Sequence, residues 1–184
     1  MRGIFFVLAV LSALPACYLP SDLSAPPDAA AAGGQTQHVL EAFDYKMLVE
    51  AGRVGGFTQI NAAPYPSTLG AFNINVLVND NARQYRAIHP DTTGTSVEIP
   101  IGTMIVRQVL DANGHVTKVT LMAKGPLGYD PTLGDWWFGV TDPDGVPLSD
   151  ASGLQLGKLT ACHSCHIPRS TDDFLFGVPG NKQP

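Results

Sequence analysis

Two of the three cysteines in this chain stand close together near its C-terminus. Cys162 and Cys165 are separated by two residues, and His166 follows directly. Three kinds of chemistry use such a group: a redox disulfide, a zinc site and a covalently attached haem. Each of them predicts a different class of protein.

The spacing favours a haem c site. A redox cysteine pair needs no histidine behind it, and zinc needs four ligands, whereas the sequence has no second Cys and His pair at a matching spacing. Two thiols on one helical turn can form thioethers to the two vinyl groups of one porphyrin, and the imidazole that follows becomes the proximal ligand of the iron. We therefore expect one covalent haem c, with Cys162 and Cys165 binding the porphyrin and His166 binding the iron.

This prediction requires an exported protein, and the N-terminus has the features of a secretory signal. The apolar run 4–14 is too short for a relaxed membrane span. Residues 14–17, LPAC, are similar to a lipobox, in which cleavage precedes an acylated cysteine, although Pro15 is uncommon there. We expect a lipoprotein-type signal peptide over 1–16 and lipid on Cys17; an ordinary cleaved signal and an uncleaved anchor are the alternatives.

Composition divides the remainder into a tether and a domain. Residues 17–35 are dense in Pro, Ala and Gly and have too few large apolar side chains to offset the entropy of ordering. Residues 36–184 have the length of one domain with one core. The net charge is -5 and no basic run occurs, which argues against nucleic acid as a partner. The sequence thus predicts a periplasmic, membrane-associated lipoprotein held by its lipid anchor.

The domain must place the cysteines and the histidine, and its patterns predict an α+β fold. Apolar residues recur at helical spacing over 36–51, whereas 72–78 alternate with a period of two. We expect an antiparallel β-sheet with an N-terminal helix and a C-terminal haem-binding helix. The other expected elements are a short helix within 79–90, a hairpin of 102–110 and 115–123 joined by the turn 111–114, and a strand over 135–142 that ends in the turn 142–145.

Four blocks in this order resemble the cytochrome P-460 family, which includes the cytochromes c-prime-beta. They are FNINVLVND, IPIGTMIVRQV, GYDPTLGDWWFGVTDPDG, and GKLTACHSCH followed by the DDFLF tail, and together they span most of residues 52–178. The resemblance implies a sheet-rich haem protein in which His166 is the only protein ligand of the iron. The sixth position would be open to a small molecule such as nitric oxide or hydroxylamine, and the protein would have a redox partner. Family members are often dimers, so a homodimer is also implied.

The resemblance also assigns two residues to the distal side. Members that oxidise hydroxylamine carry a lysine joined to the porphyrin, and the matching position here holds Arg107. A guanidinium stays protonated and is a poor nucleophile, so hydroxylamine oxidation becomes less favoured than ligand binding of the c-prime-beta type. Phe72 matches the early strand phenylalanine that caps the iron in that type. Simpler roles are packing for Phe72, and a solvated position or pairing with a haem propionate for Arg107.

The main alternative is an electron-transfer cytochrome c with a methionine as sixth ligand. Met104 and Met122 lie on the two predicted hairpin arms, in apolar patterns where methionine is usually core filler. Among other candidates, Asp172 and Asp173 are proton acceptors or, more simply, turn-capping residues. Trp136 and Trp137 point in opposite directions along their strand, so at most one faces the haem and we expect the other at the rim.

Overall fold

The structure is a computed structural model that describes residues 41–67, 72–80 and 82–179. The predicted signal peptide, Cys17 and the predicted tether 17–35 lie outside the described residues, as do residues 36–40 of the first expected helix. No helix among the described residues is long and apolar enough to cross a membrane.

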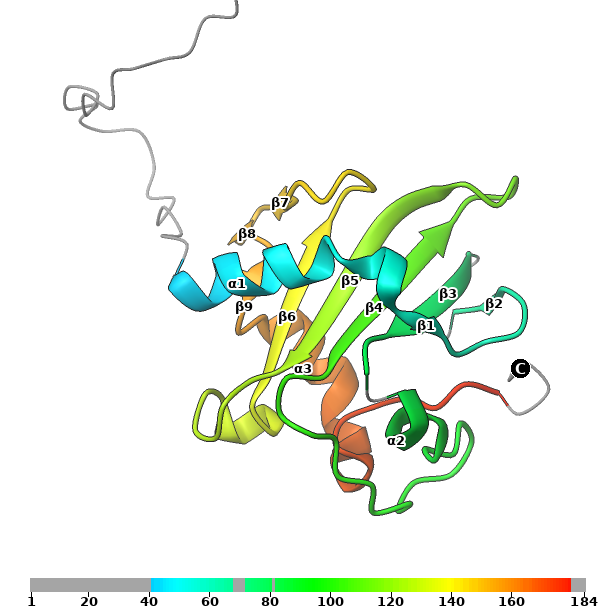
Figure 1. Cartoon of the computed structure of the whole chain (residues 1–184). Coiled ribbons are helices and arrows are strands. Elements are labelled where there is room, and N and C mark those ends of the chain that lie inside the picture. The colour runs from blue at the N-terminus through cyan, green and yellow to red at the C-terminus, as the bar shows by residue number, and fades with distance from the viewer. Residues whose placement is uncertain (1–40, 68–71, 81, 180–184) are drawn as a thin grey trace, which may run out of the picture. The chain divides into compact units, whose positions relative to one another are not determined.

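An antiparallel sheet with a few helices forms the domain, so the α+β expectation is confirmed at that level (Figure 1). The strands follow the order β1-β3-β4-β5-β6-β9, and β2 pairs with the other end of β3. A separate two-stranded sheet consists of β7 and β8. The strands are β1 Thr58–Gln59, β2 Tyr65–Pro66, β3 Asn73–Val78, β4 Met104–Leu110, β5 Val116–Lys124, β6 Trp136–Thr141, β7 Ser149–Asp150, β8 Gly153–Leu154 and β9 Leu156–Gly157.

The helical elements are short, with at most ten residues each. They are α1 Ala42–Ala51, η1 Val54–Gly56, α2 Ala82–Arg86, η2 Pro131–Leu133, α3 Thr160–His166 and η3 Ile167–Asp172. The two helices predicted before the hairpin, and the one that contains the cysteines, are therefore confirmed within the described residues.

The central hairpin forms as predicted because its turn is stabilised locally. The Asp111 Oδ1 atom accepts hydrogen bonds from the backbone N–H groups of Asn113 and His115, both at 2.8 Å. Gly114 supplies the positive φ, 86°, that such a turn requires. The turn sets the register that pairs Arg107 with Thr120 across the two strands.

Both faces of the sheet are covered. Buried residues of one face, among them Met104 and Trp137, pack with Met47 of α1. Buried residues of the other face, including Val76 and Phe138, pack with α2 and the C-terminal residues and against Cys162 of α3. Figure 1 shows α1 crossing the sheet on one side and α3 lying on the other. The two layers explain how nearly every residue of β4 and β6 can be buried.

The tryptophan pair corrects one expectation. Trp136 faces the α3 side and Trp137 faces α1, as alternation predicts, but both are fully buried and neither lies at a rim. Trp137 Nε1 donates to the Asp44 Oδ1 atom of α1 at 2.7 Å. Trp136 Nε1 donates to the Asp173 carbonyl at 2.8 Å. Each indole therefore ties one covering layer to the sheet.

The segment after η3 packs into the core beside α2. Leu175 and Val178 are buried there. Arg169 donates to the Leu175 carbonyl at 3.0 Å and to the His89 carbonyl at 2.7 Å. A Cβ at Gly177 would stand 2.2 Å from the Ile88 carbonyl oxygen, so this close approach requires glycine.

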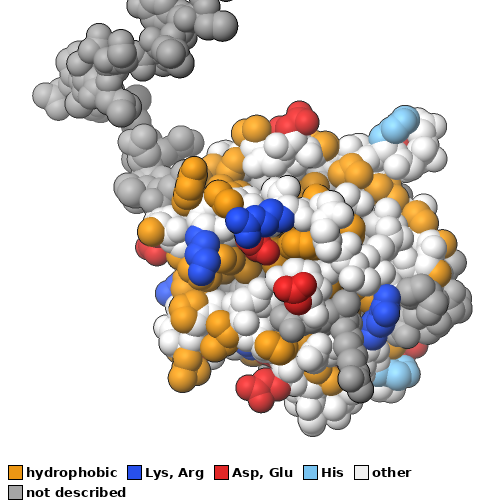
Figure 2. All heavy atoms as spheres, viewed as in Figure 1, with side chains coloured by type: hydrophobic (Ala, Val, Ile, Leu, Met, Phe, Trp, Pro, Cys, Tyr) orange, Lys and Arg blue, Asp and Glu red, His pale blue; other side chains and the backbone are white. Residues whose placement is uncertain are grey.

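Side chains of different kinds are interspersed on the face that α1 covers. Tyr45 and Val49, one helical turn apart, are exposed on the outer side of this helix. Figure 2 shows hydrophobic, basic and acidic side chains mixed on this face, with neither sign of charge gathered into a patch. The site residues lie on the opposite face of the sheet.

Candidate functional site

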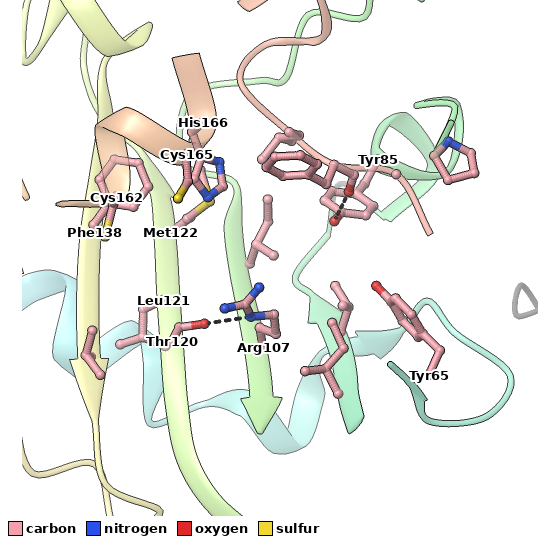
Figure 3. Close-up of a pocket in the computed structure, with 18 of the residues that line it drawn as sticks. Tyr65, Tyr85, Arg107, Thr120, Leu121, Met122, Phe138, Cys162, Cys165 and His166 are labelled. Carbon is pink, nitrogen blue, oxygen red and sulfur yellow. Dashed lines mark hydrogen bonds between the residues drawn. The ribbon is translucent and has the colours of Figure 1, made fainter. Parts of the chain in front are cut away.

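A cavity of about 330 Å³ lies between the sheet, α3 and the C-terminal segment. Cys162, Cys165 and His166 all line it, together with Arg107 from β4 (Figure 3). The volume is within the range of small-molecule sites, and most of the remaining lining is apolar. The structure thus brings the predicted thiols, the predicted iron ligand and one predicted distal residue to one partly open cavity.

The geometry of α3 explains why these three C-terminal residues share the cavity. Residues three and four apart lie on the same side of a helix, and Cys162 precedes Cys165 by three positions and His166 by four. The helix starts with hydrogen bonds from the Cys162 and His163 N–H groups to the Leu159 carbonyl. Cys162 is half-buried against the core and Cys165 is exposed, and both thiols are free.

The His166 ring is oriented by backbone and aromatic contacts. Its Nδ1 atom lies 2.6 Å from the Phe174 carbonyl oxygen. A carbonyl only accepts, so Nδ1 carries the proton and Nε2 keeps its lone pair. The rings of Phe138 and Phe176 stand edge-on to the imidazole, with centroids at 5.5 and 5.2 Å. The carbonyl therefore selects the tautomer that can bind a metal through Nε2, and the two aromatic rings restrict the orientation of the imidazole.

Burial favours the neutral forms of His166 and Cys162. Desolvation lowers the pKa of His166 below its ordinary value, more than the Phe174 hydrogen bond raises it. Desolvation also raises the pKa of the Cys162 thiol to about 11, against a smaller lowering by Arg107. A redox-active cysteine needs a depressed pKa, so the electrostatics of Cys162 do not suit the disulfide exchange chemistry considered above.

The residues around the cavity fit a covalent haem. Two thiols on one helix face, an imidazole with a free Nε2 lone pair and an apolar enclosure are the donor set and environment that haem c requires. No group of three or more His, Cys, Asp and Glu side chains that could hold a metal ion forms within the described residues. His166 would hold the iron through Nε2.

Arg107 is the polar residue of the opposite cavity wall. It is half-buried on β4, and its Nε atom donates to the Thr120 hydroxyl at 3.1 Å. Figure 3 shows this hydrogen bond, which joins the Arg107 side chain to Thr120 on the neighbouring strand β5. Tyr65 and Tyr85 line the same space. The structure shows that Arg107 is half-buried and forms part of the cavity wall, and its distal, propionate-pairing and solvated roles stay predictions.

Phe72 is not brought to the cavity with the others. It stands one residue before β3, half-buried against the core that contains Ile74 and Val76. Those two strand residues line the cavity, whereas Phe72 does not. Packing is therefore the role that the structure supports for Phe72, and the cap over the ligand position stays a prediction.

The two methionines of the hairpin lie on opposite faces of the sheet. Met104 is buried in the α1 layer, away from the cavity, so it cannot ligate an iron bound to His166. Met122 lines the cavity, and its cross-strand neighbour Phe138 contacts His166. Figure 3 shows Met122 beside Cys165 and His166, at the end of the cavity away from Arg107. Met122 thus lies next to His166 itself, and this position does not favour it as a second ligand of an iron that His166 would hold.

The two adjacent aspartates have structural roles. Asp172 is buried and accepts hydrogen bonds from the Gly94 and Thr95 N–H groups at 3.0 and 2.7 Å. Asp173 forms an ion pair with Lys124 and accepts a hydrogen bond from the Ile99 N–H. Neither lines the cavity, so the turn-capping interpretation is the one that the structure supports.

The other histidines of the described residues do not line the cavity. His89 Nδ1 accepts turn hydrogen bonds from the Asp91 and Thr92 N–H groups, and His115 contacts Asp111 on the hairpin turn. His163 lies within α3 but does not line the cavity. His38 is outside the described residues.

Several residues of the site were not identified from the sequence. Two of them could have been found from local patterns: Phe138 from the alternation of β6, and Thr120 from the hairpin register that places it opposite Arg107. Tyr65 and Phe176 reach the cavity only through long-range packing, and the Phe174 contact to His166 is made by a backbone carbonyl. Local patterns contain no information on such contacts.

No protein-family model and no curated protein matches this chain. The resemblance to the cytochrome P-460 family therefore rests on the residues quoted above.

Proposed function

We propose that this chain is an exported haem c protein that binds small ligands at the iron. The observation that carries the proposal is His166, whose Nδ1–H is held by the Phe174 carbonyl while both cysteines of the same helix line the adjoining cavity. In this proposal Cys162 and Cys165 hold the porphyrin and His166 holds the iron. The bound haem supplies an iron centre with a sixth position for a ligand, and Arg107 and Tyr65 form the wall that such a ligand meets.

The ligands that we propose are small nitrogen oxides, in line with the family resemblance. Arg107 stands where hydroxylamine-oxidising members have a cross-linking lysine, and a guanidinium does not attack a porphyrin carbon. The proposal is therefore ligand binding or redox exchange with a partner, in preference to hydroxylamine oxidation. Export and a lipid anchor at Cys17 are part of the same proposal, and the homodimer implied by the resemblance belongs to it as well.

Covalent attachment gives the direct test. The protein is produced with a haem c maturation system and extracted with acidic acetone, which removes haem that is not covalently bound. The wild type should retain its colour in the precipitated protein, and Cys162→Ala/Cys165→Ala should lose it. Cys17→Ser is the matched control, because it removes the third cysteine and should leave the haem in place. Retention of covalent haem in the double variant contradicts the proposal.

The electron-transfer alternative is kept because Met122 lines the cavity. A methionine ligand gives low-spin ferric iron and a sulfur-to-iron band at the red end of the visible spectrum. An open site gives a high-spin spectrum that changes when nitric oxide is added to the ferrous protein. The spectrum of the purified ferric protein thus separates the two functions.

A further inference from the structure

The guanidinium of Arg107 has no carboxylate partner in the described part of the chain. Its Nε–H donates to Thr120, and no ion pair with Asp or Glu forms. Arginine carries five N–H donors in a planar fork, so the Nη groups remain available to a ligand in the cavity. Among the cavity-lining residues the single carboxylate is Asp91, which is exposed.

The surroundings make an unpaired cation costly. On the strand register Arg107 lies between Val76 and Thr120, and Ile105 precedes it on the same face of β4. All three of these side chains line the cavity, and Arg107 itself is half-buried. A half-buried cation in apolar surroundings gains strongly from an anion that also accepts its hydrogen bonds.

The charge of Arg107 is felt at both ends of the cavity. Burial raises the pKa of Tyr65 to about 12, and the guanidinium works against that rise. The same charge opposes the effect of burial on Cys162, which belongs to α3 on the far side. A ligand in this space therefore experiences the positive potential of Arg107, and the one carboxylate among the described cavity-lining residues, Asp91, is exposed.

We propose that the cavity selects a small planar anion with two oxygen atoms, such as nitrite or formate, over neutral diatomic ligands. The Nη groups of Arg107 donate to the anion, and Thr120 positions the guanidinium through Nε. This inference rests on the proposed function, because the anion would occupy the ligand position at the iron. A haem propionate has the same carboxylate chemistry, so the experiment must distinguish a free anion from a propionate as the partner of Arg107.

The test is a set of ligand titrations on the haem-loaded protein at constant ionic strength. Ferric protein is titrated with sodium nitrite and with sodium formate, and ferrous protein with carbon monoxide, each followed by its absorption spectrum. In Arg107→Met we expect the anion Kd to rise about 10- to 100-fold, the usual effect of a lost charged hydrogen bond, and the carbon monoxide Kd to change less than about 3-fold. Arg107→Lys should fall between them, because it keeps the charge and loses the fork.

Two further variants separate position from charge. Thr120→Val removes the hydroxyl that holds Nε and should raise the anion Kd by about 3- to 10-fold, a smaller effect than that of Arg107→Met. Lys118→Met is the control for net charge, since Lys118 lies on β5 but does not line the cavity, and it should leave the anion Kd within about 2-fold. If Arg107→Met does not accumulate as folded protein, Arg107→Lys and Thr120→Val still test the inference.

The outcomes distinguish this inference from the proposed function. Equal anion affinity in wild type, Arg107→Met and Arg107→Lys overturns the inference, and a shifted reduction potential in those variants would then assign Arg107 to a haem propionate. Equal weakening of anions and carbon monoxide also overturns it, because it indicates a general disturbance of the cavity. A protein without covalent haem contradicts the proposed function itself and is recognised before any titration.

Discussion

The Nδ1 atom of His166 donates to the Phe174 carbonyl, whereas Nε2 keeps its lone pair. The position of this carbonyl depends on the backbone turn at Asp173 and Phe174. Asp173 and Phe174 both have left-handed backbone angles, with φ of 52° and 63°. Side chains other than glycine adopt this region at a cost, so the turn must be held by other contacts. Asp173 makes three such contacts. Its carboxylate pairs with Lys124 and accepts a hydrogen bond from the Ile99 N–H, and its backbone carbonyl accepts one from Trp136 Nε1.

Lys124→Met should therefore destabilise the domain. Both side chains of the pair are about one tenth exposed, at 12% for Lys124 and 10% for Asp173. Removal of one partner leaves a buried carboxylate without its counterion, so we expect the free energy of unfolding to fall by about 3 kcal/mol. Equilibrium urea unfolding, followed by circular dichroism, measures this change.

A second substitution tests the explanation. Asn tolerates the left-handed conformation and carries no charge, so Lys124→Met/Asp173→Asn should recover at least half of the lost stability. A loss below about 1 kcal/mol in the single variant, or no recovery in the double variant, would show that the pair does not hold the turn.

At the same scale, the sequence predicts the groups that the chain brings close together by itself. Cys162, Cys165 and His166 are neighbours on one helical turn, so their spacing is enough to place them in one cavity. The partner of His166 is a backbone carbonyl eight positions away, and Tyr65 reaches the cavity from a different part of the chain. No local pattern encodes these contacts, so the residues that surround Arg107 in the cavity could not be predicted from the sequence.

The elements around the site differ in how far they depend on tertiary contacts. Helix α1 has ten residues, too few for a stable isolated helix, so it forms because it covers the sheet. Its Asp44 is 3% exposed and accepts hydrogen bonds from Trp137 Nε1 and from the Glu41 N–H, at 2.7 and 3.0 Å. One carboxylate thus both closes the first turn of α1 and fixes the helix to β6.

Asp44→Ala should loosen α1 from the sheet. The substitution leaves the buried Trp137 N–H without an acceptor, which costs about 1 to 3 kcal/mol. Amide hydrogen exchange of residues 42–51 should become faster, and the urea midpoint should fall. Glu50→Ala is the matched control on the same helix, because its pair with Arg53 is exposed and contributes less than about 1 kcal/mol. Equal effects of the two variants would contradict the role of Asp44.

Predictability at this scale follows from element length. The hairpin of β4 and β5 has long strands and a turn with Asp111 and Gly114, so its signals are local and strong. Strands β1, β2, β7, β8 and β9 have two residues each, too few to show any period. The rim position expected for one tryptophan was wrong for another reason. Alternation predicts only that Trp136 and Trp137 point to opposite faces, whereas the burial of both faces depends on the layers that cover them.

At the scale of the whole molecule, the cavity adjoins the apolar core on one face of the sheet, and a few polar side chains contribute to its mostly apolar lining. Tyr65 and Tyr85 are 8% and 5% exposed and belong to the same cluster as the aliphatic core. Tyr85 donates a hydrogen bond to the Phe176 carbonyl at 2.6 Å, and the half-buried Arg107 lines the same cavity from β4. The site thus combines a cation with phenols that remain protonated.

This arrangement predicts that the domain loses stability in alkali. Burial raises the pKa of Tyr65 from 10.0 to about 12. Between these values the unfolded chain has released the phenolic proton while the folded protein keeps it, so the unfolded state binds fewer protons and the free energy of unfolding falls as pH rises. The contribution of Tyr65 is fully present below pH 10 and is lost by about pH 12, with a size on the order of 2 kcal/mol.

Urea unfolding at pH 8, 9, 10 and 11, compared between wild type and Tyr65→Phe, isolates this contribution, because all other titratable groups are the same in both proteins. The stability of Tyr65→Phe should decline less steeply above pH 10. The absorbance titrations of the two folded proteins should nearly coincide up to about pH 11, because the phenol of Tyr65 in the wild type stays protonated there. Parallel stability curves for the two proteins would mean that the phenol of Tyr65 reaches solvent in the folded state, and that the cavity wall next to Arg107 is more open than the packing indicates.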